Sequence, residues 1–262
     1  DNKYQLHDGE KHVRKINVYG LFKNNDTYIR YLITKFNIFE KIYDVEFSYY
    51  FFENNSTDSS KKYLKQFMKN RKGKLYSKDF VNEYKRQGRS DTRINFIKRM
   101  ETYRNHNIET SKPIKSDWNI ILDSDIYFDN DCLKQFFEIK PKKHNIGMMT
   151  PYTTIGNGTH YYDTFALVDF SGKYYHPKCI FERCKNCKIN IVKKDTKIVE
   201  VKSAFAGFAV VDSEVLKNKE VKWKTLTPKA MCEHLGFCSS VINKAKKKVV
   251  VCPQIIMTNV EK

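Results

Sequence analysis

The feature that most constrains the fold is a short apolar run that ends in two carboxylates. The run Trp118–Leu122 reads Trp-Asn-Ile-Ile-Leu, and Asp123-Ser124-Asp125 follows directly. This pattern predicts a buried strand of an α/β sheet, and such sheets bind ligands at the carboxyl ends of their strands. If strand geometry persists, Asp123 and Asp125 point the same way, and two oxygen ligands suit Mg²⁺ or Mn²⁺ with phosphate oxygens. A solvated turn after the strand is the alternative.

The chain has 262 residues, of which 40% are hydrophobic and 14% aromatic, so it is globular with a sizeable core. Its first half shows strand patterns at 16–22 and 45–52 and helix patterns at 28–43, 61–69 and 94–107, before the 118–122 strand. This alternation predicts an α/β fold with a mostly parallel sheet flanked by helices.

After Thr150 the pattern changes. Loops rich in Gly and Tyr accompany a hairpin candidate at 180–192, a short strand at 205–211 and a helix near 230–245. No linker and no internal repeat divide the chain, so we predict one domain over 1–262. The asymmetry indicates a nucleotide-binding half at 1–150 and an acceptor-binding half at 151–262.

The formal net charge is +18, and such a field attracts nucleic acid, anionic membranes, nucleotide phosphates or acidic glycans. One stretch is especially basic, and its simplest interpretation is a solvated helix face and the loop that follows it. Its members are Lys61, Lys62, Lys65, Lys69, Arg71, Lys72, Lys74 and Lys78.

Seven cysteines in a chain too large to need disulfide staples favour a reducing compartment. His176, Cys179, Cys184 and Cys187 lie close together in sequence and raise the alternatives of a zinc knuckle, a loop of free thiols or a disulfide. No apolar run approaches the length of a membrane span. The chain begins with Asp1 rather than Met, which leaves an upstream anchor or signal open.

Six short motifs follow one another in an order that is informative about the family. They are ENNSTD at 53–58, RMETYRN at 99–105, DSD at 123–125, YDTFAL at 162–167, FAGF at 205–208 and CEHLGFC at 232–238. Together they resemble the GT-A class of nucleotide-sugar glycosyltransferases, nearest to the branch of capsule-type α-1,3-mannosyltransferases and related giant-virus enzymes. The chain departs from the class where a "GGF" loop reads Ala206-Gly207 and an "ED" motif reads Glu233-His234.

The resemblance implies a divalent cation, Mn²⁺ or Mg²⁺, and a nucleoside-diphosphate sugar as donor. Asp125 would be the main metal ligand, Asp123 would contact the metal, ribose or sugar, and His234 would be a third ligand or a phosphate contact. The cation stabilises the leaving nucleoside diphosphate. A structural role is the alternative for His234.

The remaining donor contacts expected from the resemblance involve five residues. Glu53 and Asp58 would accept hydrogen bonds from the base or ribose, although Asp58 is also suited to cap the following helix. Gly207 would let the backbone approach the donor sugar, or form a bulge in a strand. Either Arg99 or Arg104 would pair with phosphate or with a carboxylate, and ordinary surface ion pairs are the alternative for both.

Glu233 and Asp163 are the candidate catalytic residues. Glu233 would act as base for the acceptor hydroxyl or as a sugar ligand, and Asp163 would hold hydroxyls beside Tyr161 and Tyr162 or deprotonate the acceptor. If the reaction retains configuration, as in the capsule-type branch, no such base is needed. A loop Asp beneath packed tyrosines is the alternative for Asp163.

We therefore predict a metal-dependent glycosyltransferase that moves a sugar from a UDP- or GDP-linked donor to a hydroxyl of a glycan, protein or lipid. The rival hypotheses are a basic nucleic-acid-binding or phosphoryl-transfer protein that uses the same Asp pair, and a silent protein that keeps the fold. No specific nucleic acid is expected as partner.

The expected location is the cytoplasm, including a viral factory in an infected cell, with the Golgi or ER lumen as the alternative if an upstream anchor was trimmed. Glycosylation sequons occur at Asn25, Asn54, Asn55 and Asn157, and two of them fall inside the proposed nucleotide loop. A glycan there would block the site, which favours a compartment without N-glycosylation.

Overall fold

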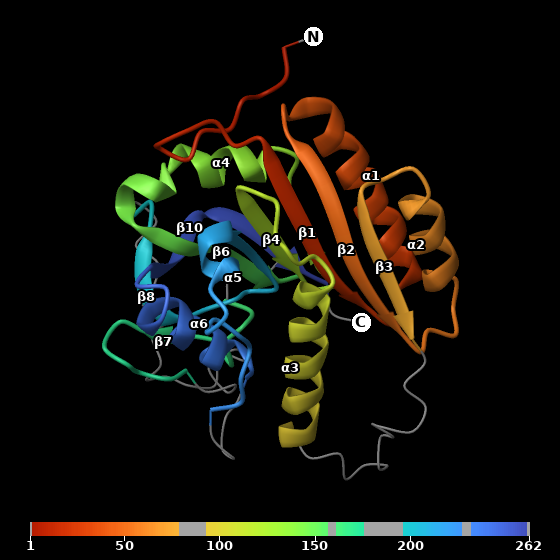
Figure 1. Ribbon diagram of the computed structural model, residues 1–262. Helices are drawn as coiled ribbons and strands as arrows, with labels where there is room; N and C mark the ends of the chain where they lie inside the picture. Colours follow the sequence, from red (N-terminus) through yellow and green to blue (C-terminus); the bar gives the residue numbers. More distant parts are fainter. Residues whose placement is uncertain (1, 79–92, 157–160, 176–195, 227–231, 261–262) are drawn as a thin grey trace.

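The computed structural model describes residues 2–78, 93–156, 161–175, 196–226 and 232–260 (Figure 1). The strands are β1 Lys15–Phe22, β2 Glu46–Asn54, β3 Gly73–Lys78, β4 Trp118–Leu122, β5 Ile126–Tyr127, β6 Ile146–Ile155, β7 Val168–Asp169, β8 Val199–Ser203, β9 Phe208–Asp212 and β10 Lys248–Asn259. The helices are α1 Asp26–Ile42, α2 Ser60–Met68, α3 Arg93–Glu109, α4 Cys132–Glu138, the 3₁₀ helix η2 Pro141–His144, α5 Ser213–Lys217 and α6 His234–Asn243. None of the helices within these ranges is both long and apolar enough to cross a membrane.

One mixed sheet runs through both predicted halves of the chain. Its order is β3-β2-β1-β4-β9-β6-β10-β8-β7, with β5 paired to β10. The four strands β3, β2, β1 and β4 are parallel to one another, and β6 is parallel to β10, whereas β9 is antiparallel to both of its neighbours. The predicted α/β fold with a mostly parallel sheet flanked by helices is confirmed.

Helices cover both faces of this sheet. Because side chains alternate along a strand, Ile120 joins the core on one face and Ile121 the core on the other. The first core holds the buried faces of α1, α2 and α4, and the second holds those of α5 and α6 together with the end of α3. In Figure 1, α1 and α2 accordingly lie side by side along β1 to β3, and α3 stands apart from them. Nearly every residue of β4 and β9 is therefore buried on both sides.

This layering places a topological switch point between β1 and β4. The chain leaves β1 through α1 on one face and reaches β4 through α3 on the other, so the connections diverge from these two neighbouring strands. A crevice forms at the carboxyl ends of strands where connections diverge in this way, and ligands of open α/β sheets bind there. The Asp123-Ser124-Asp125 turn lies directly at the end of β4, at this point.

The basic stretch was predicted as a helix followed by a loop, and the second part is wrong. Residues Gly73–Lys78 form β3, an edge strand parallel to β2. Its residues are exposed or half-buried, and its lysines face water along the edge of the sheet. Lysine is a common edge-strand residue because its charge discourages pairing with another chain. The alternating apolar signal of a half-buried strand is consequently weak here.

The second half departs further from the sequence prediction. The strand predicted at 205–211 begins only at Phe208 and ends at Asp212, because Ala206 and Gly207 have φ values of +59° and +73°. The helix predicted near 230–245 is α6, His234–Asn243, and residues 227–231 lie outside the described part. The hairpin predicted at 180–192 also lies outside it.

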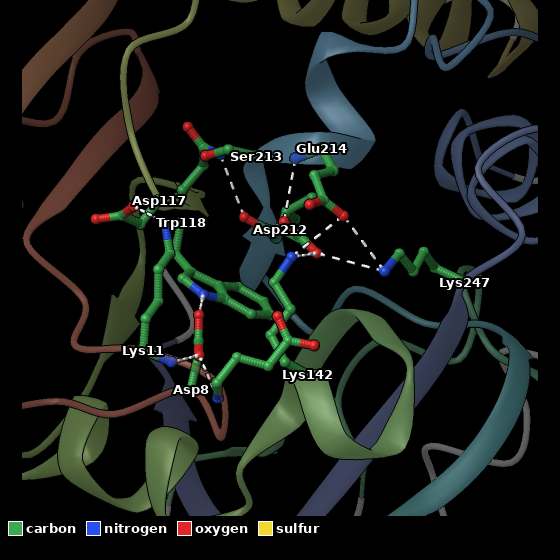
Figure 2. Close-up of polar contacts among 12 residues, drawn as sticks. Asp8, Lys11, Asp117, Trp118, Lys142, Asp212, Ser213, Glu214 and Lys247 are labelled. Carbon is green, nitrogen blue, oxygen red and sulfur yellow. Dashed lines mark hydrogen bonds and ion pairs between the residues drawn. The ribbon is translucent and has the colours of Figure 1, made fainter.

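An ion-pair network fixes the opposite end of the central strands (Figure 2). Lys142 Nζ lies 2.7 Å from Asp212 Oδ2 and 3.2 Å from Glu214 Oε2, and Lys247 approaches the same two carboxylates. The indole of Trp118, the first residue of β4, donates to the fully buried Asp8. Because Asp212 ends the antiparallel neighbour β9, this network lies at the end of β4 that is remote from Asp123.

Candidate active site

A cavity of about 360 Å³ opens beside the end of β4. Five of the residues predicted from sequence line it: Arg104, Asp123, Asp163, Glu233 and His234. Apolar and aromatic side chains form the rest of its wall, together with Cys232: Phe96, Ile97, Met100, Ile155, Tyr162, Phe165 and Phe205. The structure thus brings residues from five separate sequence motifs into one polar floor with an apolar wall.

Arg104 lies at the centre of the polar floor. Its side chain is 4% exposed, and its guanidinium donates to Asp123 Oδ1 at 2.8 Å and to Glu233 Oε1 at 2.9 Å. The same group lies 4.9 Å from the centre of the Phe205 ring, which suits a cation–π contact. Of the two partners that the sequence left open for this arginine, the structure therefore shows carboxylate.

The charge of Arg104 sets the ionisation of its partners. Burial alone would raise the pKa of Glu233, but the guanidinium of Arg104 holds that pKa below its usual value. Burial raises the pKa of Asp123, and Arg104 offsets part of this rise. Glu233 is therefore an anion at neutral pH, held against a buried cation.

Helix α3 holds this region through three neighbouring residues of the RMETYRN motif. Glu101 Oε2 accepts hydrogen bonds from the backbone and hydroxyl of Thr225, both at 2.7 Å. Asn105 exchanges two hydrogen bonds with the backbone of Trp223, at 2.8 and 3.0 Å. With Arg104 on Glu233, one side of α3 therefore fixes both the segment before α6 and the residue at its N-terminus.

Asp163 is the second acidic group of the cavity. Its carboxylate accepts hydrogen bonds from the backbone amides of Ala206 at 3.0 Å and Ala166 at 3.3 Å. Burial and the nearby charge of Asp123 nevertheless raise the pKa of Asp163 to about 7. The two hydrogen bonds tie the YDTFAL segment to the FAGF loop.

The two aspartates of the DSD motif lie in a turn, since β4 ends at Leu122. The strand geometry that would have pointed them to one face therefore stops before Asp123. They are still close neighbours: burial raises the pKa of Tyr162, and the charges of Asp125 and Asp123 raise it further. Both carboxylates thus lie beside a tyrosine that lines the cavity.

Two hydrogen bonds to its backbone hold the turn. The amide of Asp123 donates to the carbonyl of Gly207 at 2.8 Å, and the Asn25 side chain donates to the carbonyl of Ser124. Gly207 has a φ of +73°, and a Cβ there would meet the Ile126 side chain at 2.4 Å. Gly207 therefore supports the turn from behind through its backbone.

His234 is buried in an aromatic box. Its ring stacks on Phe205 at a centroid distance of 3.7 Å, and its Nδ1 accepts a hydrogen bond from the Trp223 indole at 3.1 Å. Its Nε2 lies 3.4 Å from Glu233 Oε1. Burial and the charge of Arg104 lower the pKa of His234 to about 3, so the ring is neutral at physiological pH.

The ENNSTD loop is built from hydrogen bonds between strand ends and helix starts. Glu53 is fully buried and accepts from the Ser56 amide at 2.8 Å and the Ser77 hydroxyl at 2.5 Å. Asp58 accepts from the amides of Ser60 at 2.9 Å and Asp26 at 3.1 Å, the first residues of α2 and α1. The N-cap of α2 is Ser59, one residue beyond Asp58, but Asp58 does bind the helix start as its capping role required.

Arg99 and Arg104 separate as their spacing on the helix predicted. Arg99 is half-buried and is not among the residues that line the cavity, whereas Arg104 is. Glu53, Asp58, Asp125 and Gly207 likewise lie outside the lining set. The structure therefore assigns the cavity itself to the other predicted residues.

Two contributors had no role of their own in the sequence prediction. Trp223 belongs to none of its motifs, and Asn105 entered it only as the last residue of RMETYRN. Their roles depend on a contact between residues 118 positions apart. Gly236, inside the CEHLGFC motif, is the sequence signal that marks this contact. A Cβ there would meet the Lys224 carbonyl oxygen at 1.9 Å, so only glycine allows the backbone next to Trp223 to approach α6.

The described cysteines, Cys132, Cys232, Cys238 and Cys252, are buried free thiols. The zinc, thiol and disulfide alternatives for His176, Cys179, Cys184 and Cys187 lie outside the described residues.

Solved structures with the same architecture are nucleotide-sugar enzymes of the GT-A class. TarS 1–349 from S. aureus shares 13% identity at a TM-score of 0.56, over 94% of this chain and 60% of that one. The mannosyltransferase PcManGT from Pyrobaculum calidifontis, in complex with GDP-Man and Mn²⁺, shares 10% identity at 0.55, over 97% and 58%. GalNAc-T7 with UDP, GalNAc and Mn²⁺ shares 12% identity at 0.53, over 95% and 44%.

The chain thus spans about 60% of the length of the TarS fragment and less of GalNAc-T7. No match was found among curated protein sequences. The likeness to solved structures establishes the GT-A fold that the motif order predicted.

A family model, by contrast, covers most of the sequence. The model described as Cryptococcal mannosyltransferase 1 matches residues 41–240, which include the ENNSTD, RMETYRN, DSD, YDTFAL and FAGF motifs and residues 232–240 of α6 and its approach. The chain therefore has a GT-A fold and belongs to the Cryptococcal mannosyltransferase 1 family.

Proposed function

We propose that this protein is a metal-dependent glycosyltransferase that moves a sugar from a nucleoside-diphosphate sugar to an acceptor hydroxyl. The observation that carries the proposal is the cavity at the switch point of the sheet, where Asp123, Asp163 and Glu233 surround the buried Arg104. A polar floor beneath an apolar wall suits a sugar, whose hydroxyls need hydrogen-bond partners and whose ring faces pack on aromatic groups.

The donor nucleotide would lie along the loops that follow β1 and β2. These loops are tied together by Asn24, whose side chain accepts from the Thr57 amide at 2.7 Å, and by Asp58 on the Asp26 amide. The carboxylate oxygens of Glu53 and Asp58 already accept hydrogen bonds within these loops. We therefore propose that both residues shape the nucleotide site and accept hydrogen bonds from the base or ribose with their remaining lone pairs. Arg99 remains a candidate phosphate partner at its edge.

Of the possible donors, we propose GDP-mannose first. The family description names a mannosyltransferase, and the similar PcManGT structure holds GDP-Man. TarS has been solved with UDP-GlcNAc, so a UDP-linked donor is the alternative that the same fold accommodates.

The donor set of the cavity fits a hard divalent cation. Asp123, Asp163 and Glu233 bring three carboxyl groups to a wall on which Arg104 supplies the one Arg or Lys side chain within the described lining. Carboxylate oxygens are the ligands that Mn²⁺ and Mg²⁺ prefer. We propose that Asp123, from this wall, and Asp125, two residues further along the same turn although outside the lining, would hold the cation. A bound cation would neutralise charge on the leaving nucleoside diphosphate.

Arg104, Glu233 and Asp163 would carry the remaining roles in the reaction. Arg104 keeps Glu233 ionised and holds it at a fixed separation from Asp123. Asp163, with a pKa of about 7, is matched to proton transfer at neutral pH and is the better general base of the two candidates. If the reaction retains configuration, Asp163 and Glu233 orient sugar hydroxyls instead of deprotonating the acceptor.

The acceptor is a glycan, protein or lipid hydroxyl that approaches along the apolar wall of α3. We also propose that the protein acts in the cytoplasm. The side chain of Asn25, the first sequon, is buried against the Ser124 carbonyl, where a glycan would break the turn. This supports a compartment without N-glycosylation, while membrane association through an upstream segment remains part of the proposal.

The test is nucleoside-diphosphate release and sugar transfer from GDP-mannose and from common UDP-sugars, with Mn²⁺, with Mg²⁺ and with chelator. We expect turnover with one donor class, dependence on the cation, and loss of turnover in Asp125→Ala. The matched control is Asp129→Asn, an exposed acid beyond β5. A protein that turns over no donor with any cation, or equally with chelator, would overturn the proposal.

A further inference from the structure

Trp223 and its partner His234, which lines the cavity, have no role in the reaction as described so far. Trp223 is 3% exposed and His234 is 3% exposed, so both are sequestered from water. Cys232, Glu233 and His234 offer ligand atoms within 4.8 Å of one another, and such a group can hold a metal ion. Whether His234 is a metal ligand therefore depends on which of its ring nitrogens carries the proton.

The indole of Trp223 answers this question. An indole nitrogen can only donate, so the Nδ1 of His234 that receives its hydrogen bond at 3.1 Å must be unprotonated. A neutral ring then carries its single proton on Nε2. That nitrogen lies 3.4 Å from Glu233 Oε1, and in this form it has no lone pair to offer a cation.

The position of the His234 ring is fixed by Phe205 and Trp223. Phe205 stacks on it with an interplanar angle of 16°, which sets its plane. Trp223 is itself held by both hydrogen bonds to Asn105 and by stacking on Phe237 at 4.1 Å. The contacts run in series from Trp223 through His234 and Glu233 to Arg104. Asn105, which binds Trp223, follows Arg104 on α3, so neighbouring residues of one helix lie at both ends of the series.

We propose that Trp223 and His234 are positioning residues for Glu233, and that His234 acts as an N–H group and not as a metal ligand. Trp223 selects the Nε2–H form of the ring. His234 and Arg104 then approach the same oxygen, Oε1 of Glu233, from two directions. The second oxygen, Oε2, is left for the cavity with Cys232 Sγ at 3.6 Å. This inference rests on the proposed function in one respect, the role that the proposed function assigns to Glu233.

The first test reads the ring itself and needs no activity. Two-bond ¹H–¹⁵N spectra of ¹⁵N-histidine-labelled protein distinguish the two neutral forms, and His234→Gln identifies the signal among the seven histidines. We expect the Nε2–H form, unchanged when Mn²⁺ alone is added except for proximity broadening. An Nδ1–H or doubly protonated ring would overturn the assignment.

The second test separates positioning from metal binding. His234→Gln keeps an N–H in reach of Glu233, whereas His234→Leu keeps only bulk. We expect His234→Gln to retain kcat within about threefold and His234→Leu to lose roughly 10- to 100-fold, as partners behind active groups commonly do. Mn²⁺ affinity, measured directly, should be equal in both variants and wild type.

A tenfold or larger loss of Mn²⁺ affinity in His234→Gln would identify His234 as a ligand and overturn the proposal. If no donor is turned over by wild type, the proposed function fails, but the ring form and the Mn²⁺ affinities still decide this inference.

Discussion

Asp163 shows how a single side chain can be tuned by its place in the fold. Its sequence neighbours gave only an Asp beside two tyrosines, whereas the structure adds burial, two amide donors and the charge of Asp123. The two amide donors stabilise the ionised carboxylate of Asp163, whereas burial destabilises it. Burial has the larger effect and leaves the pKa of Asp163 at about 7. The folded protein therefore keeps a proton that the unfolded chain releases above its ordinary pKa near 4.

This leads to a prediction for stability without metal. Between about pH 4 and pH 7 the folded state binds more protons at Asp163, so its contribution to stability falls as pH rises and is fully lost above pH 7. Asp163→Asn removes this term, and we expect its free energy of unfolding to fall less than that of wild type, by roughly 2–3 kcal/mol, between pH 5 and pH 8.

Urea unfolding in chelator at the two pH values measures the difference directly. Asp129→Asn is the matched control, because that carboxylate is exposed and should leave the pH dependence unchanged. Parallel pH profiles for wild type and Asp163→Asn would show that Asp163 is not the titrating group.

At the scale of single elements, sequence patterns located the parts that have strong periodicity. The strand at 118–122 matches β4, and the helices predicted at 28–43, 61–69 and 94–107 match α1, α2 and α3 within a few residues. The helix signal is strong in α1 because Ile29, Leu32 and Phe36 recur on one buried face.

The strands that went unpredicted lack such a signal. In β3, lysines and exposed positions hide the alternating apolar pattern of a strand. In β10, Pro253 interrupts the apolar run, and the register with β6 shifts between Cys252 and Ile256. Proline removes a ladder donor and is tolerated at such an irregularity. The positions of β6, β8 and β10 are set by long-range pairing, which no local pattern records.

Asp58 provides a prediction at this scale. Its two oxygens accept amides at the starts of α1 and α2, so Asp58→Ala leaves two helix N-termini with one acceptor fewer each. We expect a loss of about 1–2 kcal/mol in the free energy of unfolding, measured by urea titration.

The comparison variant is Asp26→Ala, whose carboxylate accepts a long hydrogen bond from the neighbouring Thr27 hydroxyl, at 3.4 Å. We expect it to cost less than 1 kcal/mol, the usual size of a charge effect in a first helical turn. Equal losses in the two variants would show that Asp58 does not join the two helices.

On the scale of the whole molecule, the two ends of β4 have different tasks. One end carries Asp123 and the candidate site, and the other carries the buried network of Lys142 with Asp212 and Glu214 (Figure 2). Sequence order alone indicated the site end, because motifs after strands converge at one edge of a parallel sheet. The network could not be foreseen, since Lys142 and Asp212 are 70 residues apart and carry no motif.

The division predicts that damage to the network lowers stability and spares binding. Asp212→Ala leaves the 8% exposed Lys142 with only the largely exposed Glu214. We expect a loss of about 3–5 kcal/mol in the free energy of unfolding, with donor affinity unchanged at a temperature where the variant is folded. Loss of donor affinity without loss of stability would contradict this division.

The most direct test of the central claim is calorimetric titration of GDP and UDP into wild type and Asp123→Asn, each with Mn²⁺ and with chelator. The account predicts that one nucleotide binds wild type tightly only with Mn²⁺, and that Asp123→Asn weakens this binding at least tenfold, about 1.4 kcal/mol. Equal affinity in both proteins, or binding that ignores the cation, would place the nucleotide and its metal elsewhere than at the end of β4.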